Sequence, residues 1–171
     1  MRLKQLAVTA AFFVIGTIVA VAIFAFATNE NYEESRITVE RSLIDSSGNE
    51  PLCIPKSEVC LVDIPGRGIV AFYAVDTHPF FRERNCEVKW LVDYVSLDPQ
   101  TGHNRRGWFK ANCSGSVFDL TGKAMIGPSA RNLDEFEVQI EQEKVTVFKD
   151  RLTCGLGPPP VDTCDFAPDP E

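Results

Sequence analysis

Cysteine and histidine are the residues in this sequence best able to hold a metal ion or carry redox chemistry. There are two histidines, His78 and His103. The six cysteines are Cys53, Cys60, Cys86, Cys113, Cys154 and Cys164. Four of them (Cys53, Cys60, Cys154 and Cys164) could in principle form a tetrahedral Cys₄ site, but their irregular spacing favours disulfides. Each histidine is expected in a turn at the surface rather than at a metal, because neither has a cysteine at ligand spacing.

Motifs that carry enzymatic chemistry are absent from the sequence. It contains no G-x-S-x-G, no H-E-x-x-H, no G-x-x-x-x-G-K-[ST] and no G-x-G-x-x-G. Gly66-Arg67-Gly68 predicts only a turn. The sequence therefore leaves enzymatic activity unassigned and favours a protein without catalysis of its own.

An uncharged apolar segment runs from Leu6 to Ala27. At about 1.5 Å per residue, such a helix is long enough to cross the hydrocarbon core of a bilayer. Arg2 and Lys4 precede it, which predicts a cytoplasmic N-terminus and an outer C-terminal domain, in the periplasm or an equivalent space. Ala25-Phe26-Ala27 has the form of a signal-peptidase site, so cleavage is the alternative, although apolar cores of signal peptides are usually shorter.

The part of the chain after this segment is acidic. The whole chain has 17 basic and 24 acidic residues, and residues 29–171 keep all but Arg2 and Lys4. The chain contains no block of clustered lysines and arginines. Nucleic acid is therefore excluded as a partner, because phosphate binding requires such clusters.

An even number of cysteines in an exported segment predicts a disulfide framework. Cys53 with Cys60 and Cys154 with Cys164 are close in sequence, which favours two local bridges and leaves Cys86 and Cys113 for each other. Six cysteines nevertheless allow 15 pairings, and the spacing alone does not choose among them.

The elements that would position these residues are short strands. Apolar or alternating runs are expected to form strands at 59–64, 69–75, 88–95, 107–110, 117–120, 136–140 and 145–148. Glycine and proline turns separate them, and residues 141–144 close a late hairpin. Trp90, Trp108, Phe109 and Phe118 are expected in the core. The predicted organisation is a cytoplasmic stub and membrane anchor (1–28), a linker (29–36), an all-β domain (37–153) and a proline-rich tail (154–171).

One long ordered pattern links the middle of the chain to a known family. The segment from Ala111 to Asp119 reads A-N-C-S-G-S-V-F-D, followed by Thr-Gly-Lys and then by G-P-S-A-R-N-L from Gly127 to Leu133. This resembles the second half of a Rieske iron–sulfur domain, in which C-P-x-H-G-S-x-F-D precedes a glycine turn and a proline loop, G-P-x-x-R-x-L. The resemblance covers residues 63–148. It implies an antiparallel Rieske-like β-sandwich or barrel, here behind one N-terminal transmembrane helix.

The positions that hold the [2Fe–2S] cluster in this family carry other residues here. A Rieske cluster requires two cysteines on one iron and two histidines on the other. The second box places Ala111 and Ser114 at these positions. Aligned on Cys86, the first box, C-x-H-x-x-C, places Phe81 and Glu83 there. The resemblance therefore implies a degenerate domain with no cofactor, and a [2Fe–2S] cluster with unrecognised ligands is the alternative.

Other features of the family pattern are retained. Cys86 and Cys113 match the second cysteine of each box, which in quinol-oxidising members form a disulfide between the two loops. The proline loop retains Gly127, Pro128, Arg131 and Leu133. A further hypothesis is that Phe81 fills the space that the cluster would occupy.

Three functions are compatible with this pattern. The first is a non-redox structural or assembly subunit of a membrane electron-transfer complex of the quinol–cytochrome type, with other subunits of an oxidoreductase as partners. The second is a functional Rieske electron carrier with atypical ligands. The third is a stand-alone extracytoplasmic binding module. The expected location is the inner or cytoplasmic membrane, with a single pass.

Overall fold

The computed structural model describes residues 35–48, 50–157 and 164. Within them, no helix combines the length and apolar character needed to cross a bilayer. The apolar segment Leu6–Ala27 lies outside the described residues, as does most of the proline-rich tail.

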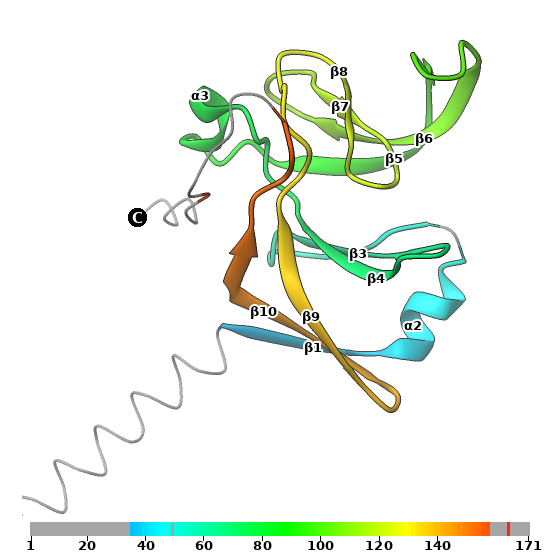
Figure 1. The fold of residues 1–171 in the computed structure, drawn as a ribbon, viewed down its shortest axis with the longest axis vertical. Helices are drawn as coiled ribbons and strands as arrows, with labels where there is room; N and C mark the ends of the chain where they lie inside the picture. The colour runs from blue at the N-terminus through cyan, green and yellow to red at the C-terminus, as the bar shows by residue number, and fades with distance from the viewer. Residues whose placement is uncertain (1–34, 49, 158–163, 165–171) are drawn as a thin grey trace, which may run out of the picture. The chain divides into compact units, whose positions relative to one another are not determined.

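The described part of the chain is all-β, as predicted, with two antiparallel sheets and two short helices (Figure 1). The six-stranded sheet has the order β1-β10-β9-β4-β3-β2, and the four-stranded sheet has the order β5-β6-β7-β8. The strands are β1 (Arg36–Glu40), β2 (Leu52–Ile54), β3 (Val59–Ile64), β4 (Gly68–Tyr73), β5 (Val88–Leu97), β6 (Asn104–Ala111), β7 (Val117–Phe118), β8 (Ala124–Ile126), β9 (Glu135–Glu141) and β10 (Lys144–Thr153). The helices are α2 (Arg41–Ser46) and α3 (Pro79–Arg82).

Alternation and turn chemistry explain the best-predicted elements. Strand β3 has the predicted bounds because V-C-L-V-D-I is almost wholly buried, packed in the core of the six-stranded sheet. The β9–β10 hairpin also forms where the period-two pattern predicts it, with Lys144 opposite Glu141. Strand β7 is shorter than predicted, because Asp119 leaves the ladder and accepts hydrogen bonds from the turn that follows.

The hydrophobic core is formed by side chains from both sheets. Phe72 of β4, Phe109 of β6 and Phe118 of β7 are all fully buried, and Phe72 and Phe109 pack edge to face at 5.9 Å. Trp108 is also fully buried, as predicted. Trp90 differs, because it is only partly buried and packs on Phe109 at the margin of the core.

Candidate functional site

The two loops that match the Rieske boxes lie against each other. Cys86 ends the first loop and Cys113 lies in the second, and their sulfur atoms form a disulfide. The backbone N–H of Cys113 also donates to Cys86 Sγ at 3.0 Å, and the N–H of Asn112 donates to the carbonyl of Glu87 at 3.0 Å. The other two local pairs, Cys53–Cys60 and Cys154–Cys164, are disulfides as well. The Cys₄ alternative is therefore wrong for this structure, because all four of its sulfur atoms are in bridges.

The four positions that match cluster ligands have different surroundings. Phe81 lies in α3, partly buried, and packs against the core cluster. Glu83 follows α3 and is exposed. Ala111, at the end of β6, is fully buried in the core. Ser114 is partly buried in the turn that follows.

These side chains do not fit a Rieske cluster. Their donors are one carboxylate and one hydroxyl, whereas the cluster needs two thiolates and two imidazoles. His78 stacks on Phe81, with ring centroids 5.2 Å apart, and His103 is exposed in the β5–β6 turn, so the two imidazoles lie on different loops. Across residues 35–48, 50–157 and 164, no three His, Cys, Asp or Glu side chains are arranged to hold a metal ion.

Ser114 is instead part of a buried polar cluster centred on Asp76. Asp76 is fully buried, and its carboxylate accepts hydrogen bonds from the hydroxyls of Ser114 and Ser129 and from the backbone N–H of His78. Ser116 Oγ lies 2.8 Å from both Ser114 Oγ and Ser129 Oγ. We call Asp76, Ser114, Ser116 and Ser129 the Asp76–serine cluster. It joins the segment before α3, the second-box turn and the proline loop, so that all three segments share one buried carboxylate.

The proline loop is held by its glycine, its arginine and its leucine. Gly127 has a φ of +105°, and a Cβ atom there would lie 2.6 Å from the Cα of Ser116, so no side chain fits. Leu133 is fully buried in the core, whereas Pro128 is exposed. The carbonyl of Arg131 accepts a hydrogen bond from Thr77 Oγ1 at 2.8 Å.

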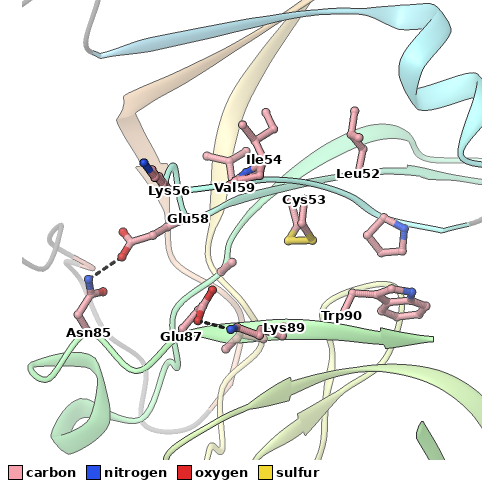
Figure 2. Close-up of a pocket in the computed structure, with 15 residues that line it drawn as sticks. Leu52, Cys53, Ile54, Lys56, Glu58, Val59, Asn85, Glu87, Lys89 and Trp90 are labelled. Carbon is pink, nitrogen blue, oxygen red and sulfur yellow. Dashed lines mark hydrogen bonds and ion pairs between the residues drawn. A yellow bond between two sulfur atoms is a disulfide. The ribbon is translucent and has the colours of Figure 1, made fainter. Parts of the chain in front are cut away.

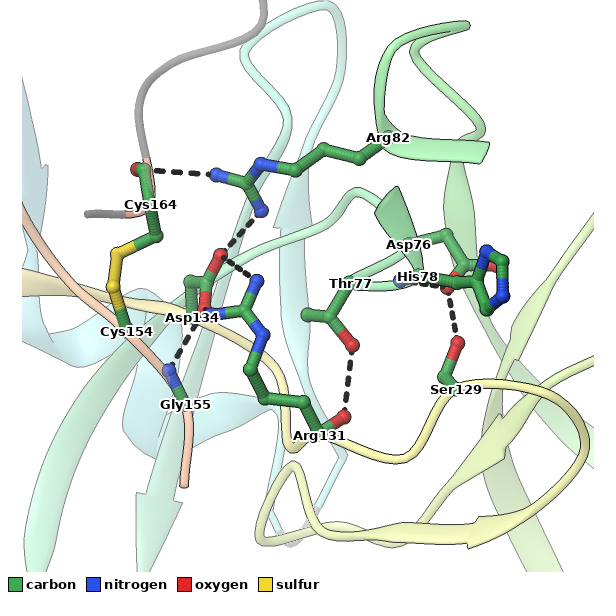
Figure 3. Close-up of polar contacts among 10 residues, drawn as sticks. All are labelled: Asp76, Thr77, His78, Arg82, Ser129, Arg131, Asp134, Cys154, Gly155 and Cys164. Atoms are coloured by element: carbon green, nitrogen blue, oxygen red, sulfur yellow. Dashed lines mark hydrogen bonds and ion pairs between the residues drawn. A yellow bond between two sulfur atoms is a disulfide. The ribbon is translucent and has the colours of Figure 1, made fainter. Parts of the chain in front are cut away.

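A second buried carboxylate, Asp134, lies beside this loop (Figure 3). The guanidinium of Arg131 donates to Asp134 at 2.6 Å, and that of Arg82 in α3 pairs with the same carboxylate. The N–H of Gly155 donates to it at 2.7 Å, and Arg82 also donates to the carbonyl of Cys164 at 3.2 Å. The Asp134 side chain is fully buried, so its charge is neutralised by two arginines rather than by water.

Sequence reasoning identified the loops but missed the acids and serines that hold them together. Asp76, Ser129 and Asp134 belong to no ligand motif. The contacts Asp76–Ser114, Asp76–Ser129 and Asp134–Arg82 join residues 38, 53 and 52 positions apart. The only signal was a positional one: an aspartate precedes α3, two serines lie in the second box and one lies in the proline loop.

Comparisons with known proteins find similarity among solved structures. No family model matches the chain, and no curated protein matches it. The crystal structure of the cyanobacterial plasma membrane Rieske protein PetC3 from Synechocystis PCC 6803 is similar to this chain, at 25% sequence identity and a TM-score of 0.43. The alignment covers 65% of this chain and 97% of that chain.

Proposed function

We propose that this protein is a Rieske-like domain without a [2Fe–2S] cluster, which serves as a structural or assembly subunit of a membrane electron-transfer complex. The observation that carries the proposal is the contact between Ser114 and Asp76. Ser114 occupies the place of a histidine ligand in the family pattern. Its hydroxyl donates to the buried carboxylate of Asp76, so this position presents no imidazole to an iron atom.

Retention of the loop framework supports a preserved surface. The Cys86–Cys113 disulfide holds the two box loops together, and the Asp76–serine cluster attaches the proline loop to them. In a cluster-binding domain the iron itself crosslinks the two loops. Here the hydroxyls and the disulfide supply the connection, which keeps the end of the domain ordered without a metal.

The tests of iron content and redox activity are direct. The full chain would be purified in mild detergent after expression in an oxidising compartment, and its iron, visible absorbance and reduced EPR spectrum would be measured. We expect substoichiometric iron and no rhombic signal from a reduced Rieske centre. Stoichiometric iron with that signal would instead establish the electron-carrier alternative.

The partner part of the proposal needs a separate test. Mild-detergent purification from the native membrane, followed by mass spectrometry, should recover cytochrome or quinol-oxidising subunits at a constant ratio to this chain. Recovery of the chain alone would contradict a subunit role and favour the binding module.

Anchoring is also part of the proposal. The intact mass of the native protein should include Met1 to Ala27, with the β domain digested by protease only from the outer side of the membrane. A mature N-terminus at Thr28 would contradict the anchor.

A further inference from the structure

A groove of about 750 Å³ lies away from the Asp76–serine cluster, between the β2–β3 hairpin and β5 (Figure 2). Strand β2 is the last strand of the six-stranded sheet, and β5 is the first strand of the four-stranded sheet, so the groove follows two sheet edges. Leu52 and Trp90 are among its apolar side chains, and Lys56 and Lys89 are among its charged ones.

The Cys53–Cys60 disulfide forms part of the wall of this groove. Cys53 lies directly opposite Cys60 in the β2–β3 register. Cys53 is exposed, and its sulfur projects from the hairpin toward β5 in Figure 2, whereas Cys60 is 2% exposed and belongs to the core. Both cysteines line the groove, and the exposed Cys53 is the more accessible of the two to an entering thiolate.

The hairpin closed by this bridge is short, and its loop is also held by hydrogen bonds from Asn85 and from the N–H of Ala74 to Glu58. Strand β2 is attached to β3 by three residue pairs. The bridge spans a sequence separation of 7, against 27 for Cys86–Cys113 and 10 for Cys154–Cys164, and shorter loops give less stabilisation. Lys56 and Glu58, both inside the bridged loop, have φ values of +66° and +57°, which are unfavourable for residues with a side chain.

We propose that Cys53–Cys60 is a thiol–disulfide exchange site that takes the thiolate of a dithiol partner through this groove. The partner thiolate attacks Cys53 Sγ, and the Cys53–Cys60 bond breaks as the new mixed disulfide forms. Cys60 leaves as a thiolate and takes a proton. The second thiol of the partner, as a thiolate, then attacks the partner sulfur that is bonded to Cys53. The mixed disulfide breaks, and Cys53 leaves as a thiolate and takes a proton. The partner is oxidised to a disulfide, and the pair on this chain gains two electrons and two protons.

The surroundings of the two sulfur atoms assign their roles in the reduced form. Cys60 is 2% exposed and packs in the core, so an external disulfide reaches it less readily than Cys53. Cys53 is exposed and lines the groove, whose charged side chains are the bases Lys56 and Lys89 and the acids Glu58 and Glu87. Cys53 is therefore the sulfur that reacts with an external disulfide, and Cys60 is the one that closes the bridge again.

The order in which the three disulfides are reduced tests this proposal. The full chain in mild detergent would be equilibrated in glutathione buffers of stepped potential, alkylated with N-ethylmaleimide and mapped by peptide mass spectrometry. We expect Cys53 and Cys60 to be alkylated at potentials where the other two bridges are intact, and to be reduced about tenfold faster by dithiothreitol. Reduction of either other bridge first, or of all three together, would overturn the proposal.

Two single variants test access through the groove. Cys60→Ser leaves Cys53 as the free thiol, and Cys53→Ser leaves Cys60, so they are matched. With oxidised glutathione we expect the Cys60→Ser variant to form the mixed disulfide about tenfold faster than the Cys53→Ser variant. Equal rates in two folded variants would overturn the proposed access, and if either variant fails to fold, the reduction order in the unaltered chain decides.

Discussion

The hydroxyl of Ser114 donates a hydrogen bond to the buried carboxylate of Asp76. The two residues are 38 positions apart, and Ser114 stands where the family pattern has a histidine ligand. The proposed alignment with the Rieske pattern puts an iron ligand at this position, and in this structure Ser114 instead joins two loops of the protein itself.

Ser114→Ala should destabilise the domain by about 1.5–3 kcal/mol, because a buried charged acceptor loses one of its donors. Urea denaturation followed by tryptophan fluorescence would measure the change in the free energy of unfolding. Ser46→Ala is a suitable control, since Ser46 is exposed and its hydroxyl bonds only to the carbonyl of Leu43, three residues earlier. An effect of Ser114→Ala no larger than that of the control would show that the contact contributes nothing.

Phe81→Ala should lower stability by about 1.5–3 kcal/mol, because Phe81 buries part of its ring against the core. If Phe81 filled the cluster space completely, its ring would be fully buried, and Phe81→Ala would cost more, about 3–5 kcal/mol. Phe80→Ala is the matched control, since the neighbouring ring is 50% exposed. Thermal unfolding of both variants would decide, and equal melting temperatures for the two would argue against any filling role for Phe81.

Asp134→Asn should cost about 3–5 kcal/mol, because it removes the charge that compensates buried Arg131. Glu137→Gln removes an acid from an exposed pair with Arg151 and should change stability by about 0–1 kcal/mol. Chemical denaturation of the two variants in the same buffer gives the comparison. Similar values would mean that solvent reaches Asp134 and screens its charge.

Replacement of both Cys86 and Cys113 by alanine should destabilise the domain by about 3 kcal/mol, since the bridge closes a loop with a sequence separation of 27. The double replacement of Cys154 and Cys164, with a separation of 10, should have a smaller effect. Differential scanning calorimetry under non-reducing conditions would rank the two variants. A larger loss from the second replacement would contradict the loop-length argument.

Sequence patterns predicted the strands that bury one or both faces and missed strands that are very short or lack an apolar pattern of their own. Strand β3 and the β9–β10 hairpin follow from local alternation. Strand β2 has only three residues, and its place as an edge strand depends on pairing with β3 and on the Cys53–Cys60 bridge. Strand β1 has no distinctive apolar pattern, so its place beside β10 depends on the rest of the sheet.

The sequence predicted some residues of the candidate site and missed others. The resemblance brought together Cys86, Cys113 and the proline loop, which are indeed neighbours in the structure. It gave no reason to expect Asp76 or Asp134, because buried acids are defined by which donors surround them in three dimensions. The spacing of residues along the chain does not show which donors will surround a buried acid in the folded protein.

The position of Asp134 has a consequence for how this end of the domain opens. Its carboxylate is held by α3 through Arg82, by the proline loop through Arg131 and by the backbone at Gly155, and Arg82 also binds the carbonyl of Cys164. Withdrawal of α3 or of the proline loop removes one of the two arginines that pair with this buried carboxylate, and withdrawal at Gly155 removes a hydrogen-bond donor. We therefore expect these segments to open as one cooperative unit of local unfolding, whose amides exchange hydrogen together rather than loop by loop.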